Sequence, residues 1–221
     1  MIYITGDTHG YYDQFIARFN GVLPSQNDIV IVCGDFGFIF SDRQQEDFDK
    51  LKGFPCSILF VDGNHENFPK IFSYPEEEWC GGKIHRIAPN IIHLMRGQLF
   101  TINEKTFFTM GGAYSIDRGW RIRGKSWFEE ELPSNEEYKT ASATLEKCGY
   151  KVDYILTHEA PESAIMRMGI TPNPRGAELA GYLEWLKRTT DFKMWFFGHY
   201  HQECTIDEKL ICLYENIITL S

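Results

Sequence analysis

The chain has 221 residues and a formal net charge of −9 at neutral pH, because 31 Asp and Glu outnumber 22 Lys and Arg. Hydrophobic residues make up 43% of it and aromatic residues 15%, which excludes a disordered chain. The negative charge argues against a protein that coats nucleic acid or an anionic membrane, since like charges repel, but it leaves a small anionic substrate open.

The N-terminal residues MIYITGDTHG contain neither the basic nor the apolar segment of a signal peptide. No apolar run reaches the roughly 18 residues that a transmembrane helix needs. The six cysteines lie far apart without CxxC spacing, which is typical of reduced thiols. We therefore expect a cytoplasmic protein that does not associate with a membrane.

Short apolar runs that are typical of buried strands recur along the chain, at residues 1–5, 29–33, 57–61, 154–157 and 194–197. These runs are continuous and do not alternate with polar residues, so we expect the strands to be covered on both faces. Segments 11–19 and 41–51 between the first three runs have helical character. This succession predicts a layered α/β fold in one domain over residues 1–221.

Further elements are predicted from local signals. Hairpins are expected at 99–102 with 106–110 and at 205–206 with 210–213. A helix begins after Ser134 in a capping box and ends before Gly149, and leucines at helical spacing predict another over 177–189. We interpret residues 76–78 as a solvated acidic turn, and His85 and His93 as structural or surface residues.

Polar residues gather directly after the five apolar runs. In chain order they are Gly6-Asp7-Thr8-His9-Gly10, Gly34-Asp35, Gly63-Asn64-His65-Glu66, Thr157-His158-Glu159 and Gly198-His199-Tyr200-His201. Open α/β sheets bind ligands at such strand ends. The Asp, Asn and His side chains are oxygen and nitrogen ligands for divalent cations, and a carboxylate can bridge two ions about 3.5–4 Å apart. The pattern predicts a site for two metal ions.

Each motif taken alone has a simpler explanation. A Gly-Asp pair is common at turns, and a lone His9 or His158 is more often an ordinary surface or core histidine. The coincidence of such residues at five successive strand ends favours the metal site.

The series GDTHG, GD, GNHE, TH and GHYH resembles the calcineurin-like metallophosphoesterases, in which GDxHG, GD, GNH[DE], H and GHxH occur in this order. The resemblance extends from residue 6 to residue 201. It implies an α/β fold of four layers, in which two mixed β-sheets form a sandwich flanked by helices. It also implies two divalent ions at the strand ends.

The resemblance also implies roles for single residues. One ion would be held by Asp7, His9, Asp35 and His201, and the other by Asp35, Asn64, His158 and His199, with Asp35 as the bridge. His65 would protonate or stabilise the leaving-group oxygen, and Glu66 would orient the His65 imidazole. We expect Mn²⁺, with Fe, Zn²⁺ and Ni²⁺ as alternatives that suit the same ligands.

One departure from the family concerns phosphate binding. Its protein Ser/Thr phosphatases continue the second motif as GDxxDRG, and this Arg is missing from FGFIF at residues 36–40. Arg118, Arg121 and Arg123 are candidate substrate-binding substitutes, because they follow a Gly-Gly turn at residues 111–112. The alternative is that they are surface charges paired with Glu129–Glu131. Trp120 and Trp127 either stack on a base or pack.

The leading hypothesis is hydrolysis of a phosphomonoester or phosphodiester, on a nucleotide or a short nucleic-acid substrate. Residues 88–115 are similar to RNA lariat debranching enzymes, but the acidic charge predicts no strong nucleic-acid-binding surface. One alternative is a protein Ser/Thr phosphatase, which the missing Arg argues against. Another is a non-catalytic interaction module, which is disfavoured because all seven ligands and His65 are present.

Overall fold

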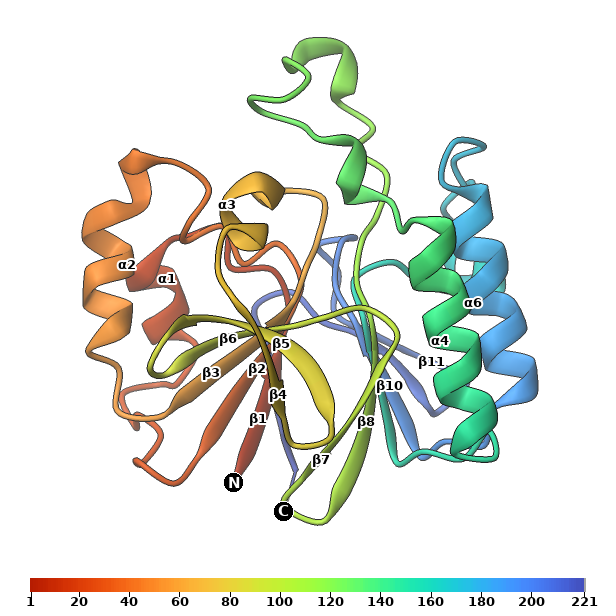
Figure 1. The fold of residues 1–221 in the computed structure, drawn as a ribbon, viewed down its shortest axis with the longest axis horizontal. Helices are drawn as coiled ribbons and strands as arrows, with labels where there is room; N and C mark the ends of the chain where they lie inside the picture. The colour runs from red at the N-terminus through yellow and green to blue at the C-terminus, as the bar shows by residue number, and fades with distance from the viewer. Residues whose placement is uncertain (221) are drawn as a thin grey trace.

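Two mixed β-sheets packed face to face, with helices on both outer sides, form the computed structural model, which describes residues 1–220 (Figure 1). The strand order is β13-β1-β2-β3-β6-β5-β4 in one sheet and β11-β12-β10-β9-β8-β7 in the other. This architecture confirms the four-layer sandwich that the resemblance implies.

The first sheet has four parallel central strands and antiparallel strands at its two margins. Its strands are β1 (Ile2–Thr5), β2 (Ile29–Cys33), β3 (Ser57–Val61), β4 (Glu76–Trp79), β5 (Gly82–Ala88), β6 (Ile91–Leu94) and β13 (Ile217–Leu220). The second sheet follows the same plan. Its strands are β7 (Gln98–Ile102), β8 (Lys105–Met110), β9 (Tyr154–Thr157), β10 (Met194–Phe197), β11 (Cys204–Ile206) and β12 (Leu210–Cys212).

Helices cover the outer face of each sheet. They are α1 (Tyr12–Ala17), α2 (Gln45–Lys52) and α3 (Phe68–Phe72) on one side, and α4 (Asn135–Lys147), α5 (Glu162–Arg167) and α6 (Ala177–Thr189) on the other. Short 3-10 turns occur at Asp42–Gln44, Arg118–Trp120 and Glu129–Glu131. The capping box of Ser134 and Glu137 starts α4 as predicted, and Gly149 follows its end with φ 66°.

Three buried clusters hold these layers together. Side chains of both sheets, such as Ile4 and Leu156, interdigitate between them, which explains the continuous apolar runs. A second cluster lies between the first sheet and α1 to α3, and a third between the second sheet and α4 to α6. The five predicted core strands therefore have helices on one face and the other sheet on the opposite face.

One predicted turn is in fact a strand. Residues 76–78 belong to β4, which pairs antiparallel with β5 at the margin of the first sheet. Two consecutive residues with positive φ, Cys80 and Gly81, close the hairpin. Because β4 is an edge strand, its glutamates reach solvent while their backbone pairs, and Glu77 forms an ion pair with Arg86.

His85 and His93 are structural residues buried on β5 and β6, where their Nδ1 atoms lie 3.1 Å apart. The six cysteines, all within the described residues, are free. Over residues 1–220 no helix combines the length and apolar character needed to cross a bilayer.

Candidate metal centre

Five strands bring the predicted motifs together where the two sheets meet. β1, β2 and β3 of the first sheet lead into Asp7, Asp35 and Asn64, and β9 and β10 of the second lead into His158 and His199. The neighbouring strands run parallel within each sheet, so their carboxyl ends lie side by side. Side chains from both sheets then meet in one place, with Asp35 Oδ1 3.3 Å from His158 Nε2.

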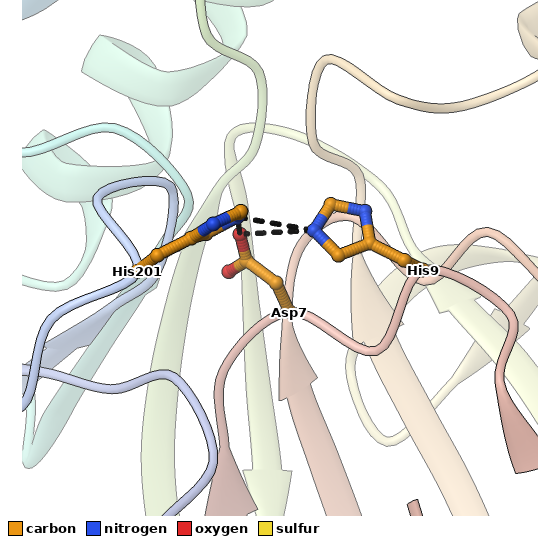
Figure 2. A group of neighbouring side chains, drawn as sticks. All are labelled: Asp7, His9 and His201. Carbon is orange, nitrogen blue, oxygen red and sulfur yellow. Dashed lines mark hydrogen bonds and ion pairs between the residues drawn. The ribbon is translucent and has the colours of Figure 1, made fainter. Parts of the chain in front are cut away.

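Asp7, His9 and His201 form one group of potential ligands, and their side chains point toward one another (Figure 2). The Nε2 atoms of His9 and His201 lie 3.1 Å apart, and His201 Nε2 lies 3.1 Å from Asp7 Oδ2. Asp7 Oδ2 is buried and accepts no hydrogen bond. A proton can satisfy only one of these contacts, whereas a cation between the three atoms satisfies all of them, so the group fits a metal ion.

Asp7, Asp35 and His158 form an adjoining group, which is completely buried. His158 Nδ1 lies 2.8 Å from the carbonyl oxygen of Cys33 and donates a hydrogen bond to it. His158 Nε2 then faces Asp35 Oδ1 and, at 3.1 Å, Asn64 Oδ1. A histidine whose second nitrogen is held by a carbonyl is the usual arrangement at metal sites. This group therefore also fits a cation.

The two groups are contiguous. Asp7 belongs to both, and the two oxygens of Asp35 face different histidines, since Oδ2 lies 3.9 Å from His9 Nδ1 while Oδ1 faces His158. His199 lies beside the second group, with its ring centroid 5.0 Å from that of His158. Its backbone N–H donates to Asp7 Oδ1 at 3.0 Å. All seven residues predicted as ligands are thus gathered at one site.

The backbone is strained at four of these residues. His9, Asp35, His199 and His201 have φ of 49°, 47°, 70° and 49°, in the left-handed region that residues other than glycine rarely adopt. Such strain persists only where surrounding contacts enforce it, and it concentrates at functional sites. Two such contacts hold the backbone at His9 and Asp35, since the N–H groups of Thr8 and His9 both donate to the carbonyl of Asp35. Nothing in the sequence pattern signals these backbone conformations.

Two glycines of the motifs leave space that the ligands occupy. A Cβ on Gly34, whose φ is 89°, would lie 2.1 Å from His158 Nδ1. A Cβ on Gly63 would lie 2.1 Å from Asp35 Oδ1. Both positions require glycine because ligand side chains pack directly against the backbone there.

The charges of the site are strongly coupled. Burial alone would raise the pKa of Asp35, but the facing imidazoles, His158 first, hold it well below its usual range. Burial alone would lower the pKa of His158, but the carboxylates of Asp35 and Asp7 raise it above its usual value. The protein thus stabilises positive charge at this point, as a cation site must.

His65 and Glu66 lie next to the ligands but are not hydrogen-bonded to each other. The backbone N–H of His65 donates to Asp35 Oδ1 at 2.7 Å, and its side chain lines the cleft described below. Glu66 is buried and accepts hydrogen bonds from the backbone N–H of Phe36 at 2.7 Å and of Gly37 at 3.4 Å. The expectation that Glu66 orients the His65 ring is therefore corrected: Glu66 holds the loop that carries Asp35.

A comparison with known protein families agrees with this geometry. The sequence profile described as calcineurin-like phosphoesterase matches residues 1–203 of the chain. The chain belongs to the calcineurin-like phosphoesterase family. It is therefore a member of a hydrolase family with dinuclear metal sites, and its two Asp/His groups are the candidate metal site. No curated protein matches the sequence at a significant level.

A cleft of about 520 Å³ opens beside the metal centre of this phosphoesterase. The residues that line it are Asp35, Asn64, His65, Tyr114, Ile116, Asp117, Glu159, Ile165, Ile170, Thr171, Asn173, Gly176, Ala180, His199, Tyr200 and His201. The Tyr200 hydroxyl and the Ala160 N–H both donate to Glu159 Oε1. Glu159 and Tyr200 belong to the motifs Thr157-His158-Glu159 and Gly198-His199-Tyr200-His201, but the sequence did not predict their place in the cleft wall.

The three candidate arginines are not among the residues that line this cleft within residues 1–220. Arg118 Nε lies 2.5 Å from Glu131 Oε1, and Arg123 Nε lies 3.1 Å from Glu129 Oε1. Arg118 and Arg123 are thus paired with the glutamates at 129–131, as the alternative interpretation expected, and do not line the cleft.

Arg121 also pairs with a carboxylate of its own segment, but it is linked to the metal centre by hydrogen bonds as well. Its Nη1 donates to Ser115 Oγ at 2.7 Å and to Asp117 Oδ1 at 3.2 Å. Ser115 Oγ in turn accepts a hydrogen bond from Asn64 Nδ2 at 3.1 Å. Arg121 therefore helps to position the predicted ligand Asn64 through Ser115.

The two tryptophans have different surroundings. Trp127 packs against Arg118, whose guanidinium carbon lies 4.3 Å from its ring centroid. Trp120 is 94% exposed. The structure thus assigns a packing role to Trp127.

Proposed function

We propose that this phosphoesterase hydrolyses a phosphomonoester or phosphodiester of a nucleotide or short nucleic-acid substrate, and that the chain acts as one catalytic domain with two divalent ions. The observation that carries the proposal is the contiguity of the two ligand groups, which share Asp7 and are linked by Asp35, whose Oδ1 faces His158 and whose Oδ2 faces His9. Two ions in such a site, when bound, would polarise the phosphoryl group and lower the pKa of a water toward neutrality.

We assign the ligands as the resemblance implies. Asp7, His9, Asp35 and His201 would hold one ion, and Asp35, Asn64, His158 and His199 the other. The two Asp35 oxygens face different histidines, which supports the role of Asp35 as the bridge. Mn²⁺ is the ion we propose, because carboxylate, amide and imidazole ligands together suit it.

The other residues position the reactants or move a proton. His65 lines the cleft next to Asp35, where its imidazole can donate a proton or a hydrogen bond to the leaving-group oxygen. Its position is set by the backbone bond to Asp35. Glu66 holds the Asp35 loop through two backbone amides, and Arg121 holds Asn64 through Ser115. No covalent intermediate with the protein is required.

The test is an activity screen of the metal-reconstituted protein on p-nitrophenyl phosphate, bis-p-nitrophenyl phosphate, cyclic nucleotides and a phosphopeptide. We expect turnover of at least one nucleotide or nitrophenyl ester that depends on added divalent metal. Turnover of the phosphopeptide alone would favour the protein phosphatase alternative.

A matched pair of histidine variants separates the site from the rest of the fold. His201→Ala removes a ligand and should lower both metal content and turnover, whereas His85→Ala removes a histidine that contacts His93 and should leave metal content unchanged. Equal metal loss in both variants would contradict the assignment of the site.

A further inference from the structure

Apart from the proposed metal ions, the cleft beside the metal centre offers an anionic substrate no lysine or arginine side chain among the described residues that line it. Besides the predicted ligand Asp35, its wall carries two carboxylates, Asp117 and Glu159. Arg118, Arg121 and Arg123 are held by carboxylates of their own segment. A further positive group at the rim is therefore needed to complement a substrate with negative charge outside the reach of the metal ions.

Arg175 is an exposed arginine beside this cleft. It belongs to the loop between α5 and α6, in which Thr171, Asn173 and Gly176 line the cleft. Two prolines, Pro172 and Pro174, restrict the loop backbone, and Asn173 Oδ1 accepts the N–H of Arg175 at 2.9 Å. The loop is thus preorganised to present Arg175 at the rim.

The guanidinium of Arg175 is partnered by a neutral group. Its Nη1 donates to the hydroxyl of Tyr114 at 2.9 Å, and Tyr114 is a nearly buried residue of the cleft wall. Among the described residues 1–220, Tyr114 is the group that interacts with this guanidinium, and no carboxylate pairs with it. The tyrosine therefore fixes one edge of the guanidinium without neutralising its charge, which leaves the other N–H groups for an acceptor.

We propose that Arg175 is a substrate-binding residue that donates hydrogen bonds to the non-bridging oxygens of a phosphate group in the cleft, with Tyr114 as its positioning residue. This inference rests on the proposed function, because it adds a specificity determinant to the same site. The phosphate is either the scissile group or a second one on the same substrate. Arginine suits both, since its planar fork matches two phosphate oxygens.

The test compares Arg175→Gln with Arg123→Gln, a matched exposed arginine that is paired with Glu129 outside the cleft. Two substrates with the same leaving group are used: thymidine 5′-(p-nitrophenyl phosphate) and its 3′-phosphorylated derivative. We expect Arg175→Gln to raise KM about tenfold, as for loss of a charge-assisted hydrogen bond, and Arg123→Gln to change KM less than about twofold. Arg175→Lys should recover part of the loss.

The pattern across substrates identifies the phosphate. A rise in KM on both substrates assigns Arg175 to the scissile phosphate, and a rise confined to the 3′-phosphorylated substrate assigns it to a second phosphate. Tyr114→Phe should raise KM by a smaller factor with kcat unchanged, because the guanidinium loses its anchor but keeps its charge. An unchanged KM for Arg175→Gln on both substrates would overturn the proposal.

A binding measurement keeps this inference distinct from the proposed function. Inorganic phosphate is titrated into the metal-loaded wild type and into metal-loaded Arg175→Gln by calorimetry. If the wild type turns over neither ester, the proposed function fails. A dissociation constant for phosphate about tenfold higher in the variant than in the wild type would still support Arg175 as an anion-binding residue. Equal affinities exclude the scissile-phosphate position. Thymidine 3′-phosphate is titrated in the same way, and equal affinities of the two proteins for both ligands overturn the inference.

Discussion

The metal centre and the arm formed by residues 111–131 both follow strands of the sandwich, yet they are built in opposite ways. At the metal centre the ligands are mostly buried, the backbone is strained, and charges of opposite sign converge from five strands. The arm projects beyond the body of the molecule (green, top of Figure 1) and exposes Ile116, Trp120 and Ile122.

The arm's charges are satisfied locally. Glu131 is buried at its base, accepts the N–H and hydroxyl of Ser115, and pairs with Arg118. The difference teaches that a cluster of arginines near a site in the sequence is not free to bind phosphate when its own segment supplies carboxylates. The ligands of the metal centre are brought together by the ends of strands that are distant in the chain. The charged residues of the arm instead pair with one another within the same segment.

Asp35→Asn should have the largest effect. Because the two Asp35 oxygens face different histidines, we expect both metal ions to bind more weakly and turnover to fall by about a thousandfold or more. Asp117→Asn, which removes a carboxylate of the arm, should keep its metal. Metal analysis of the two purified variants measures this contrast, and two ions at full occupancy in Asp35→Asn would refute the bridging assignment.

His65→Ala should keep both ions and lower kcat by about a hundredfold on alkyl phosphate esters, because the leaving group loses its proton donor. The loss should be smaller on p-nitrophenyl esters, whose leaving group needs no proton. Steady-state kinetics on the two ester classes, with metal content as the control, measures the difference. Equal losses on both classes would count against general-acid catalysis.

Gly34→Ala and Gly124→Ala compare the two regions directly. Both glycines have positive φ, 89° and 73°, but only Gly34 has an atom of another residue, His158 Nδ1, at 2.1 Å from the new Cβ. We expect Gly34→Ala to cost about 3 kcal/mol of unfolding free energy or more and Gly124→Ala about 1 kcal/mol. Urea unfolding of the metal-free proteins measures both, and similar costs would show that the site is no more tightly packed than the arm.

Substitutions of the arm's arginines should have smaller effects than Gly34→Ala. Arg118→Ala leaves the buried carboxylate of Glu131 without its ion-pair partner and should destabilise the arm by about 2 kcal/mol. Arg123→Ala removes an exposed ion pair and should cost less than about 0.5 kcal/mol. Hydrogen exchange of residues 111–131 measures both. Identical exchange in the two variants would mean that the Arg118 pair does not anchor the arm.

The elements that were predicted correctly depend on local signals. The strands at 29–33, 57–61, 154–157 and 194–197 have the predicted limits, because continuous apolar runs bounded by glycine or polar residues are specific for buried strands. The Ser134 capping box predicted the start of α4 for a similar reason, since both of its hydrogen bonds lie within four residues. The ligand set was visible because each ligand directly follows a strand.

What was missed depends on partners distant in the chain. β4 is acidic and has no apolar pattern, and it forms a strand only because β5 is available to pair with it. Glu66 was expected to contact its neighbour His65, but it binds the backbone of Phe36, thirty residues earlier in the chain. No sequence pattern pointed to Arg175, because its place at the cleft rim depends on a hydrogen bond to Tyr114, sixty-one residues away.

The amino-acid order therefore determined the strands, their ligand-bearing ends and the family to which the chain belongs, since these are written in adjacent residues. The tertiary structure alone decided which charges are already paired, which backbone positions are strained and which arginine remains available beside the cleft. The physical reason is that a residue type specifies the interactions a side chain can make, while the partners that satisfy them are selected only when distant segments pack together.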